Sequence, residues 1–267
     1  MNALQGYLDT AVKAALSGGA ILQKNYGKLS RGQVHAKGHH DWVTDVDHAS
    51  EKAVLGIITK KYPKHAIMAE ESAPKAAMEE CQWLIDPLDG TINYLHGFPM
   101  FCVSIALVYE GQLAAGVIYD PFKKELFTAL RGSGAYLNKK RLKVSGRKHL
   151  EESLLATGFP FRAQDKLDVY LQSFKTVFLK TGSIRRPGSA ALDLAYVACG
   201  RLDGFWEMSL QPWDIGAGAL MITEAGGKVT NFFGKETFLR DGHVASGSPL
   251  IHKQLLETIS PIFRGKI

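Results

Sequence analysis

Two aspartates that stand three residues apart give the sequence its strongest chemical signal. An apolar run, residues 83–85, leads into Asp86, and Pro87 and Leu88 separate Asp86 from Asp89. Because proline forces the chain to turn, both carboxylates can face one point. Mg²⁺ prefers oxygen ligands, and the Leu88 carbonyl could join the two carboxylates. The segment predicts a metal site; the alternative is an Asx turn in which both aspartates bond only local amides.

The residues that follow indicate an anion site. Gly90 and Thr91 would present backbone N–H groups to a phosphate if a helix begins there, because helix N-termini favour phosphate. Further carboxylates, Glu70, Asp47 and Asp214, stand at the ends of other predicted elements. Each alone is more often a helix cap than a ligand. Together they place acidic groups at several element ends, where the sites of layered folds are assembled.

Hydrophobic periodicity in residues 1–150 indicates helices over a sheet rich in antiparallel strands. Up to about residue 62 the pattern is mostly helical, with a loop at residues 27–40 that we expect to be mobile. Thr44 and Asp47 form a capping box at the start of the second helix, which Pro63 ends. The apolar runs that predict strands are 66–69, 83–85, 101–109 and 113–119, the last two joined at Gly111.

Residues 151–267 alternate strands and helices, which is typical of an α/β layer. The predicted elements are strand 154–157, helix 165–179, strand 183–185, a helix capped by Ser189, strand 203–207, a helix from Trp213 and a last helix capped by Ser248. No Pro-rich or Ser-rich linker separates the halves. We therefore expect an α+β half, 1–150, with the metal-binding and phosphate-binding motifs, and an α/β half, 151–267, in one layered body.

The composition excludes several classes of protein. With 46% hydrophobic and 22% charged residues, the chain of 267 residues is neither disordered nor a coiled coil. No apolar stretch approaches the roughly 20 residues of a membrane-spanning helix. Three cysteines without a C-x-x-C pair argue against a disulfide framework, and we expect a cytoplasmic protein. The net charge of +6 is compatible with an anionic substrate or with nucleic acid, although the basic residues are dispersed.

The sequence resembles the inositol monophosphatase family, within the lithium-sensitive, metal-dependent phosphatase superfamily that includes fructose-1,6-bisphosphatase. The resemblance is carried by residues 69–72, 86–93 and 213–218, and residues 156–161 and 185–196 are most similar to the bacterial SuhB-type branch. Ile92 departs from the hydroxyl residue common in the family, and Gly216 departs from alanine. The resemblance implies a layered αβαβα sandwich and a lithium-sensitive homodimer.

Carried over residue by residue, the resemblance implies a site for two to three Mg²⁺ ions. Glu70, Asp86 and the Leu88 carbonyl would hold the first ion, Asp86, Asp89 and Asp214 the second, and a weaker third site would lie near Glu70. Paired ions of this kind lower the pKa of an attacking water and neutralise charge on the leaving oxygen. The metal-binding Asp86 would bridge the two main ions.

Catalytic and substrate-binding residues are implied in the same way. Glu70, Thr91 and Asp47 are the expected catalytic residues, with Thr91 and Asp47 helping to activate the water. Lys37 matches a position that nears the active site when its loop closes. The expected substrate-binding residues are Asp89, Gly90, Thr91, Arg185, Ala190, Glu207 and Asp214. Arg185 could equally be half of an exposed pair with Arg186.

The function that follows is a Mg²⁺-dependent phosphomonoesterase, which hydrolyses inositol monophosphate or a related small polyol or sugar phosphate with a metal-activated water. Fructose-1,6-bisphosphate and nucleotide phosphates are alternative substrates, because they present a similar phosphate to the same metals. A different class of function is a factor that binds RNA or the transcription machinery, as some bacterial family members are reported to do. The +6 charge permits that alternative.

Overall fold

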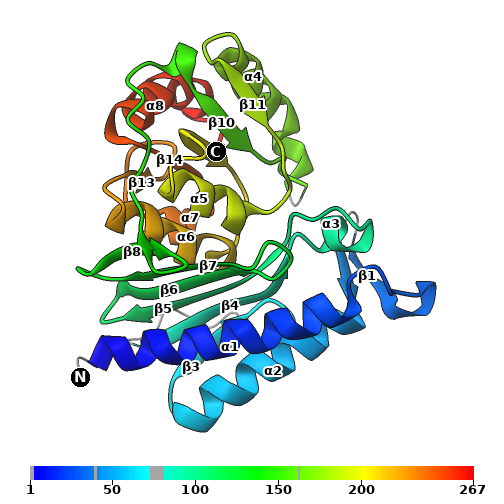
Figure 1. The fold of residues 1–267 in the computed structure, drawn as a ribbon. Helices are drawn as coiled ribbons and strands as arrows, with labels where there is room; N and C mark the ends of the chain where they lie inside the picture. Colours follow the sequence, from blue (N-terminus) through cyan, green and yellow to red (C-terminus); the bar gives the residue numbers. More distant parts are fainter. Residues whose placement is uncertain (1–2, 39–40, 73–80, 162) are drawn as a thin grey trace.

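A computed structural model describes residues 3–38, 41–72, 81–161 and 163–267, and it has five layers (Figure 1). Helices α1 (Ala3–Asn25) and α2 (Asp45–Lys61) cover the outer face of a seven-stranded sheet. Helices α5 (Ala190–Ala198) and α6 (Pro212–Glu224) lie between this sheet and a five-stranded one. Helices α4 (Leu167–Phe178) and α8 (Pro249–Phe263) form the last layer. The αβαβα sandwich expected from the sequence is confirmed.

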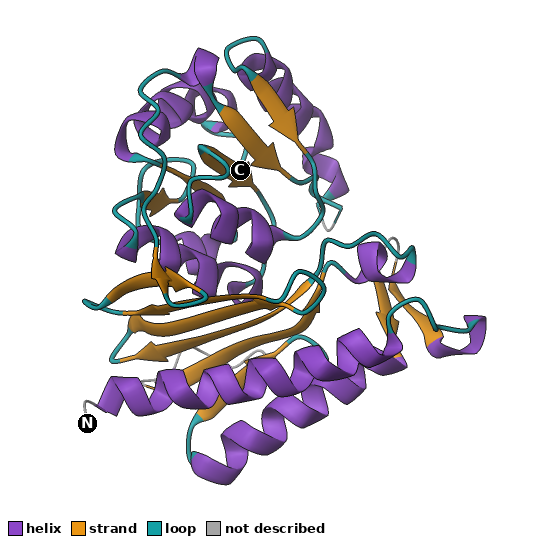
Figure 2. Cartoon of the chain, in the orientation of Figure 1, coloured by secondary structure: helices purple, strands orange, loops and turns teal. Residues whose placement is uncertain are grey.

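The seven-stranded sheet has the strand order β3-β4-β5-β6-β7-β8-β9. Its strands are β3 (Ala66–Ala69), β4 (Cys81–Asp89), β5 (Cys102–Tyr109), β6 (Gln112–Asp120), β7 (Glu125–Leu130), β8 (Gly134–Leu137) and β9 (Lys140–Arg141). Strands β3 and β4 run parallel, and every later neighbour is antiparallel, as Figure 2 shows for the central strands.

The five-stranded sheet is mixed, with the order β11-β10-β12-β14-β13. Its strands are β10 (Leu154–Thr157), β11 (Ser183–Arg185), β12 (Gly204–Glu207), β13 (Lys228–Thr230) and β14 (Val244–Gly247). Strands β10, β11 and β12 are parallel, so their carboxyl ends meet at one edge. The shorter elements are α3 (Thr91–Leu95), α7 (Phe238–Asp241) and the 3₁₀ helices η1 (Arg31–Gln33), η2 (Leu150–Glu152) and η3 (Gln164–Lys166).

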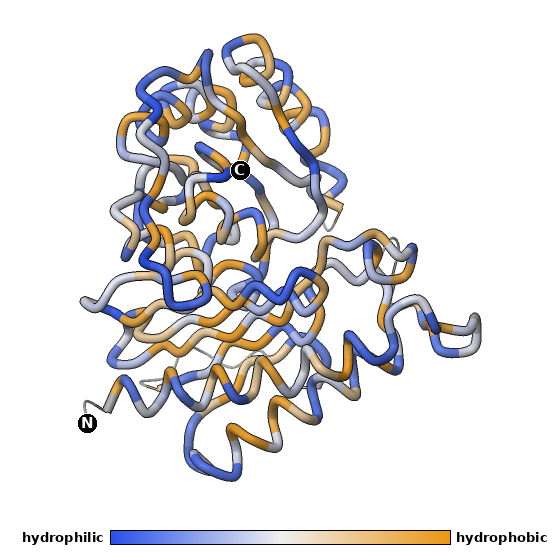
Figure 3. The backbone as a smooth tube through the Cα atoms, viewed as in Figure 1, coloured by the Kyte–Doolittle hydropathy of each residue, from blue (hydrophilic) through white to orange (hydrophobic). Residues whose placement is uncertain are grey.

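Strand β5 shows why the central strands read as continuous apolar runs. Alternate residues of a strand point to opposite faces of the sheet. Val103 and Leu107 pack toward α1 and α2, whereas Ala106 and Val108 pack toward α5 and α6. Both faces are buried, so neither set is polar, and the hydropathy colouring of Figure 3 is accordingly apolar along much of this sheet. A sheet covered on both sides thus follows directly from the unbroken run at 101–109.

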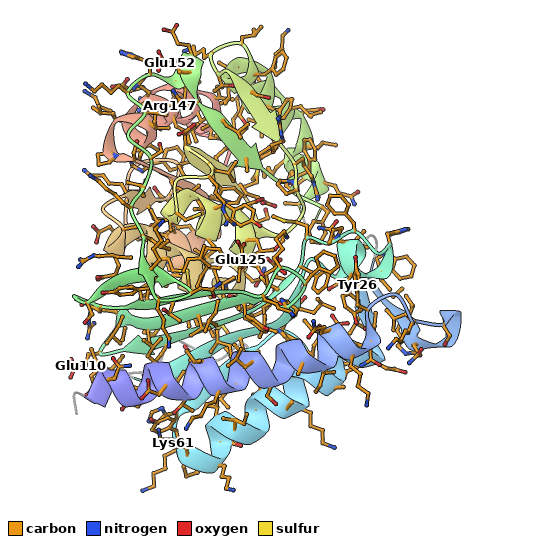
Figure 4. The ribbon with its side chains drawn as sticks, in the orientation of Figure 1. Tyr26, Lys61, Glu110, Glu125, Arg147 and Glu152 are labelled. Carbon is orange, nitrogen blue, oxygen red and sulfur yellow. The ribbon has the colours of Figure 1, made fainter. Side chains whose placement is uncertain are left out.

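Two contacts join the halves of the chain. Gly116 of β6 lets α6 approach closely, since a Cβ there would stand 3.1 Å from the Cα of Ala217. At the edge of this layer Arg201 makes a bidentate ion pair with Glu125 of β7, whose position Figure 4 marks, with one Nη1 to Oε2 distance of 2.7 Å. Helix α6 therefore packs between the two sheets, and its N-terminus lies at the boundary between the two halves of the chain.

The segment expected as a loop at residues 27–40 differs from the prediction. Strand β1 (Val34–Gly38) pairs antiparallel with β2 (Asp41–Thr44), after the short helix η1. His35 and Ala36 are exposed in β1, and its alternation of apolar and polar residues spans only four positions in a segment rich in glycine, so the composition favours a loop. Strands β7, β8, β13 and β14 were also not predicted. No helix in the described ranges is long and apolar enough to cross a bilayer.

His252 of α8 gives the fold a pH dependence that can be measured. Its ring is buried, and Nε2 lies 2.9 Å from Oγ1 of Thr230. Burial, with a smaller contribution from Lys228, lowers the pKa of His252 to about 4. Between about pH 6.5 and pH 4, His252 therefore binds a proton in the unfolded chain, where its pKa is the ordinary value of about 6.5, but not in the folded chain. Stability that is present above pH 6.5 is lost as the pH falls toward 4.

We expect the titration of His252 to lower the unfolding free energy by about 2 kcal/mol as the pH falls from 7 to 5. His252→Gln keeps a partner for Thr230 but cannot titrate, so the fall over that interval should be smaller by this amount. Urea denaturation of both proteins at the two pH values measures the difference. Equal falls in the wild type and the variant would mean that His252 is protonated in the folded chain.

Candidate active site

A cavity of about 380 Å³ is lined by residues of β4, of β12 and of the N-terminal turns of α5 and α6. Four of the acidic residues predicted from the sequence line it: Glu70, Asp86, Asp89 and Asp214. They come from the end of β3, from β4 and from the first turn of α6. Carboxylates separated by as many as 144 positions in the sequence thus surround one space.

A bulge in β4 turns Asp86 and Asp89 toward the same side. Residues three apart in a regular strand point to opposite faces of the sheet. Here Asp86 pairs with Ser104 and Asp89 with Cys102, so three steps on β4 match two on β5. The extra residue reverses the alternation, and both carboxylates reach the cavity. Pro87 stands inside the bulge, where its lack of an N–H costs no strand hydrogen bond.

Gly90 continues this turn in a conformation that only glycine adopts without strain. Its φ is +92°, and a Cβ would stand 2.7 Å from the carbonyl oxygen of Met100. Helix α3 begins at the next residue, Thr91, as the anion-site prediction required. Gly90 and Thr91 both line the cavity, beside Asp89. The segment therefore carries its carboxylates and its helix start to one wall.

Thr91 is held between a carbonyl and a buried carboxylate. Its Oγ1 lies 3.0 Å from the Leu88 carbonyl oxygen and 3.2 Å from Oδ1 of Asp47. Asp47 in turn accepts a 2.9 Å hydrogen bond from the Thr44 N–H in the capping box of α2. The structure thus brings Thr91 and Asp47 together as the resemblance implied. Asp47 itself lies behind Thr91 and does not line the cavity.

Two helix N-termini from the second half hold the other aspartates. Oδ2 of Asp89 accepts hydrogen bonds from Oγ of Ser189 at 2.6 Å and from the N–H of Ala191 at 2.8 Å. Oδ2 of Asp214 accepts from the N–H of Gln211 at 2.8 Å, in the capping box of α6. Helix N-termini stabilise negative charge. Ser189, predicted only as a helix cap, is therefore also the residue that positions Asp89.

Mutual repulsion is the main electrostatic feature of the site. Burial raises the pKa of Asp86 well above its usual range, and the charges of Glu70, Asp89 and Asp214 raise it further. Burial also raises the pKa of Asp89 to about 6, against the hydrogen bonds from Ser189 and Ala191 that lower it. The cluster concentrates negative charge in a partly buried space, a state that a cation would relieve.

The donor set suits a hard divalent cation. Its atoms are all oxygens, four carboxylates and the buried carbonyl of Leu88, which is what Mg²⁺ requires. Among the described residues, no three carboxylates converge closely enough to hold an ion as they stand. One oxygen each of Asp86, Asp89 and Asp214 instead accepts a backbone N–H. The residues fit a metal by their chemistry and shared cavity, and binding requires the carboxylates to move closer together.

The second half of the chain supplies the opposite wall. Ala190 and Glu207, both expected to contact substrate, line the cavity. Arg185 does not: its Nη1 donates to Oγ of Ser183 and to the Ile184 carbonyl at the exposed end of β11. The next residue, Arg186, lines the cavity instead, because successive residues of an extended chain point in opposite directions. Of the expected cavity-closing residue, Lys37, the backbone is in β1 and the side chain lies outside the described part.

Comparison with known proteins places the chain among inositol monophosphatases and their relatives. Residues 3–264 match the family model described as the inositol monophosphatase family. The Nus factor SuhB of Pseudomonas aeruginosa is 48% identical over 263 residues, 97% of each chain. The Nus factor SuhB of Escherichia coli is 44% identical over 250 residues, 93% of this chain and 94% of that one.

Solved structures give the same result. The extragenic suppressor protein SuhB of Bartonella henselae superposes with a TM-score of 0.91 at 42% identity, covering 98% of this chain and all of that one. The inositol monophosphatase of Anabaena has a TM-score of 0.87 at 43% identity, over 97% of this chain and 96% of that one. The similarity in structure thus covers nearly the whole chain, as the similarity in sequence does.

The repulsion around Asp86 predicts that removing its charge stabilises the protein when no cation is present. Asp86→Asn keeps an oxygen that can accept from the Leu88 N–H, and we expect it to raise the unfolding free energy in EDTA at pH 7.5 by about 1 kcal/mol or more. Asp120→Asn is the matched control, because Asp120 is equally buried but is paired with Lys123, so its substitution should destabilise. Urea denaturation measures both. A destabilised Asp86→Asn would show that the four charges do not repel.

Proposed function

We propose that this chain, which belongs to the inositol monophosphatase family, is a Mg²⁺-dependent phosphomonoesterase that acts on a small polyol or sugar phosphate. The observation that carries the proposal is the group of carboxylates from both halves of the chain around one cavity, where burial and then mutual repulsion raise the pKa of Asp86. An anionic phosphate ester cannot enter such a site unless cations neutralise it. A metal-dependent phosphatase reconciles the acidic site with an anionic substrate.

Glu70, Asp86, the Leu88 carbonyl, Asp89 and Asp214 would hold two to three Mg²⁺ ions. Bound there, the ions would supply charge neutralisation for the phosphate and would lower the pKa of the attacking water. The protein's own contribution is to hold five oxygen donors on rigid elements, with Ser189 and Ala191 fixing Asp89. Lithium sensitivity, which the sequence resemblance implies, belongs to the same proposal.

Thr91 and Asp47 would position the attacking water. The Thr91 hydroxyl has one proton, which it can donate to Oδ1 of Asp47, and its lone pairs then remain to accept from a water in the cavity. Asp47 is buried and held by Thr44, so it keeps the hydroxyl in that orientation. Glu70, the remaining catalytic residue that the resemblance implies, lines the same cavity and would accept the water's second hydrogen.

Binding of substrate divides between the two walls. Gly90 and Thr91 would face the phosphate, next to Asp89 and Asp214, and Ala190 and Glu207 would face the alcohol. Arg186 takes the place on the rim that the sequence analysis gave to Arg185. Inositol monophosphate fits this division because it carries one phosphate and several hydroxyls. Fructose-1,6-bisphosphate and nucleotide phosphates share its phosphate half and are the alternative substrates.

A second candidate function comes from the names of the relatives. The Pseudomonas aeruginosa and Escherichia coli proteins are both called Nus factors, and each matches more than nine-tenths of this chain. A corresponding transcription-associated role for this chain would use an outer surface rather than the cavity. It would survive Asp86→Asn, whereas phosphatase activity would not.

Release of inorganic phosphate tests the phosphatase proposal directly. We expect turnover of inositol 1-phosphate with Mg²⁺, and loss of that turnover by at least a hundredfold in excess EDTA, because the carboxylates then repel the substrate. Fructose-1,6-bisphosphate, a nucleoside monophosphate and p-nitrophenyl phosphate complete the panel. Undiminished turnover in EDTA, or no turnover of any ester with Mg²⁺, would contradict the proposal.

A further inference from the structure

A buried carboxyl group in the cavity wall has no part in the chemistry above. Asp193 lies in the first turn of α5, is 1% exposed and lines the cavity. Its Oδ1 is fully buried and has no hydrogen-bond partner among the described residues. Buried polar atoms in folded proteins are nearly always hydrogen-bonded, so an unpaired carboxylate oxygen at a cavity wall needs an explanation.

The position of Asp193 in the helix does not provide that explanation. A carboxylate in the first turn is favoured by the helix dipole, but such residues serve this role at the surface, where water completes their hydrogen bonds. Asp193 is buried, so water cannot complete its hydrogen bonds, and Ser189 already caps the first turn of α5. Burial raises the pKa of Asp193, and the nearby charges of Glu207 and Asp89 raise it further. A neutral side chain at this position would therefore stabilise α5 as well as Asp193 does.

The surroundings of Asp193 identify which end of a substrate it would meet. Glu207 ends β12 and Arg186 precedes α5, and both line the cavity with Asp193. The Arg186 charge lowers the pKa of Asp193, but by less than burial and the Glu207 and Asp89 charges raise it. All three residues belong to the second half of the chain, which supplies the alcohol-side wall. The phosphate-side residues Glu70 and Asp86 come from the first half.

We propose that Asp193 accepts a hydrogen bond from a hydroxyl group of the substrate alcohol and so selects phosphate esters of polyols or sugars. The inference rests on the proposed function, because the phosphate bound at the opposite wall is what brings the alcohol to Asp193. A hydroxyl is the donor that Oδ1 lacks. Because Oδ1 is closed off from solvent, the Asp193 carboxyl group would have to rotate toward the cavity to meet that hydroxyl. An alkyl or aryl group in its place would leave that oxygen buried and unpaired, which is how polar sites reject analogues without hydroxyls.

The first experiment compares two esters that share a phosphate but differ in hydroxyls. Asp193→Asn keeps the volume but puts an amide NH₂ in place of one accepting oxygen, and we expect its kcat/KM for inositol 1-phosphate to fall about 10- to 100-fold. Its kcat/KM for p-nitrophenyl phosphate should change less than about threefold, because that ester offers no alcohol hydroxyl. Equal losses on both esters would overturn the proposal, since they would mean that Asp193 supports the fold or the metal site.

Asp203→Asn is the matched control. Asp203 is also buried in the second half, where its Oδ2 accepts a 2.7 Å hydrogen bond from the Leu154 N–H, but it does not line the cavity. Its substitution should lower thermal stability and leave the ratio of the two kcat/KM values unchanged. A changed ratio in Asp203→Asn would show that loss of stability alone can imitate specificity, and the ratio in Asp193→Asn would then no longer support the proposal.

A series of deoxy-inositol 1-phosphates tests the same contact on the wild-type enzyme. Removing the hydroxyl that Asp193 binds should cost the wild type about 10-fold or more in kcat/KM, and should cost Asp193→Asn little further. No loss in the wild type for any single deoxy analogue would overturn the proposal, even if the variant fails to fold. Mg²⁺-dependent hydrolysis of p-nitrophenyl phosphate by the wild type reports on the proposed function separately. Its absence would count against the phosphatase, whereas its presence with an unselective Asp193→Asn would count against Asp193 alone.

Discussion

Repulsion between buried carboxylates is the constraint on which the rest of the structure depends. Asp86 is surrounded by Glu70, Asp89 and Asp214, and both burial and these charges work against its ionisation. Such a cluster lowers the stability of the chain by itself, so it persists only where a large core outweighs it. Three apolar clusters provide that core. One lies between the first helix layer and the seven-stranded sheet, one between the two sheets, and one between the five-stranded sheet and the last helix layer. Bound cations would relieve this repulsion, and the free energy gained in that way would contribute to the affinity of the site for metal.

The fold holds the cluster by bringing rigid elements from two halves to one point. A one-residue bulge in β4 aligns Asp86 with Asp89, and the N-terminus of α5 then binds Asp89 through Ser189 and Ala191. The metal side of the cavity is thus positioned by the half that also carries the alcohol side, including Asp193. A change that loosens α5 would disturb both functions together. In the proposed enzyme, catalysis and specificity would both depend on the position of this one helix.

The sequence predicted those features whose cause is local or periodic. Two-sided burial made the strand at 101–109 readable, and the spacing around Pro87 indicated that Asp86 and Asp89 meet, although a bulge rather than a simple turn achieves it. The β1–β2 hairpin was missed because its strands are short and lie in a glycine-rich segment whose composition is typical of a loop. Arg186 and Asp193 were missed for another reason: which of two adjacent arginines faces a cavity, and whether a first-turn aspartate is buried, depend on tertiary packing that a single sequence does not encode.

Calorimetric titration of Mg²⁺ into the protein tests the central claim most directly, because it requires no substrate. The account predicts that the wild type binds Mg²⁺ with measurable heat, that Asp86→Asn loses most of this binding although it is the more stable protein in EDTA, and that Asp120→Asn retains it. Absence of Mg²⁺ binding by the folded wild type, or equal binding by Asp86→Asn, would contradict the claim that the clustered carboxylates form a metal site.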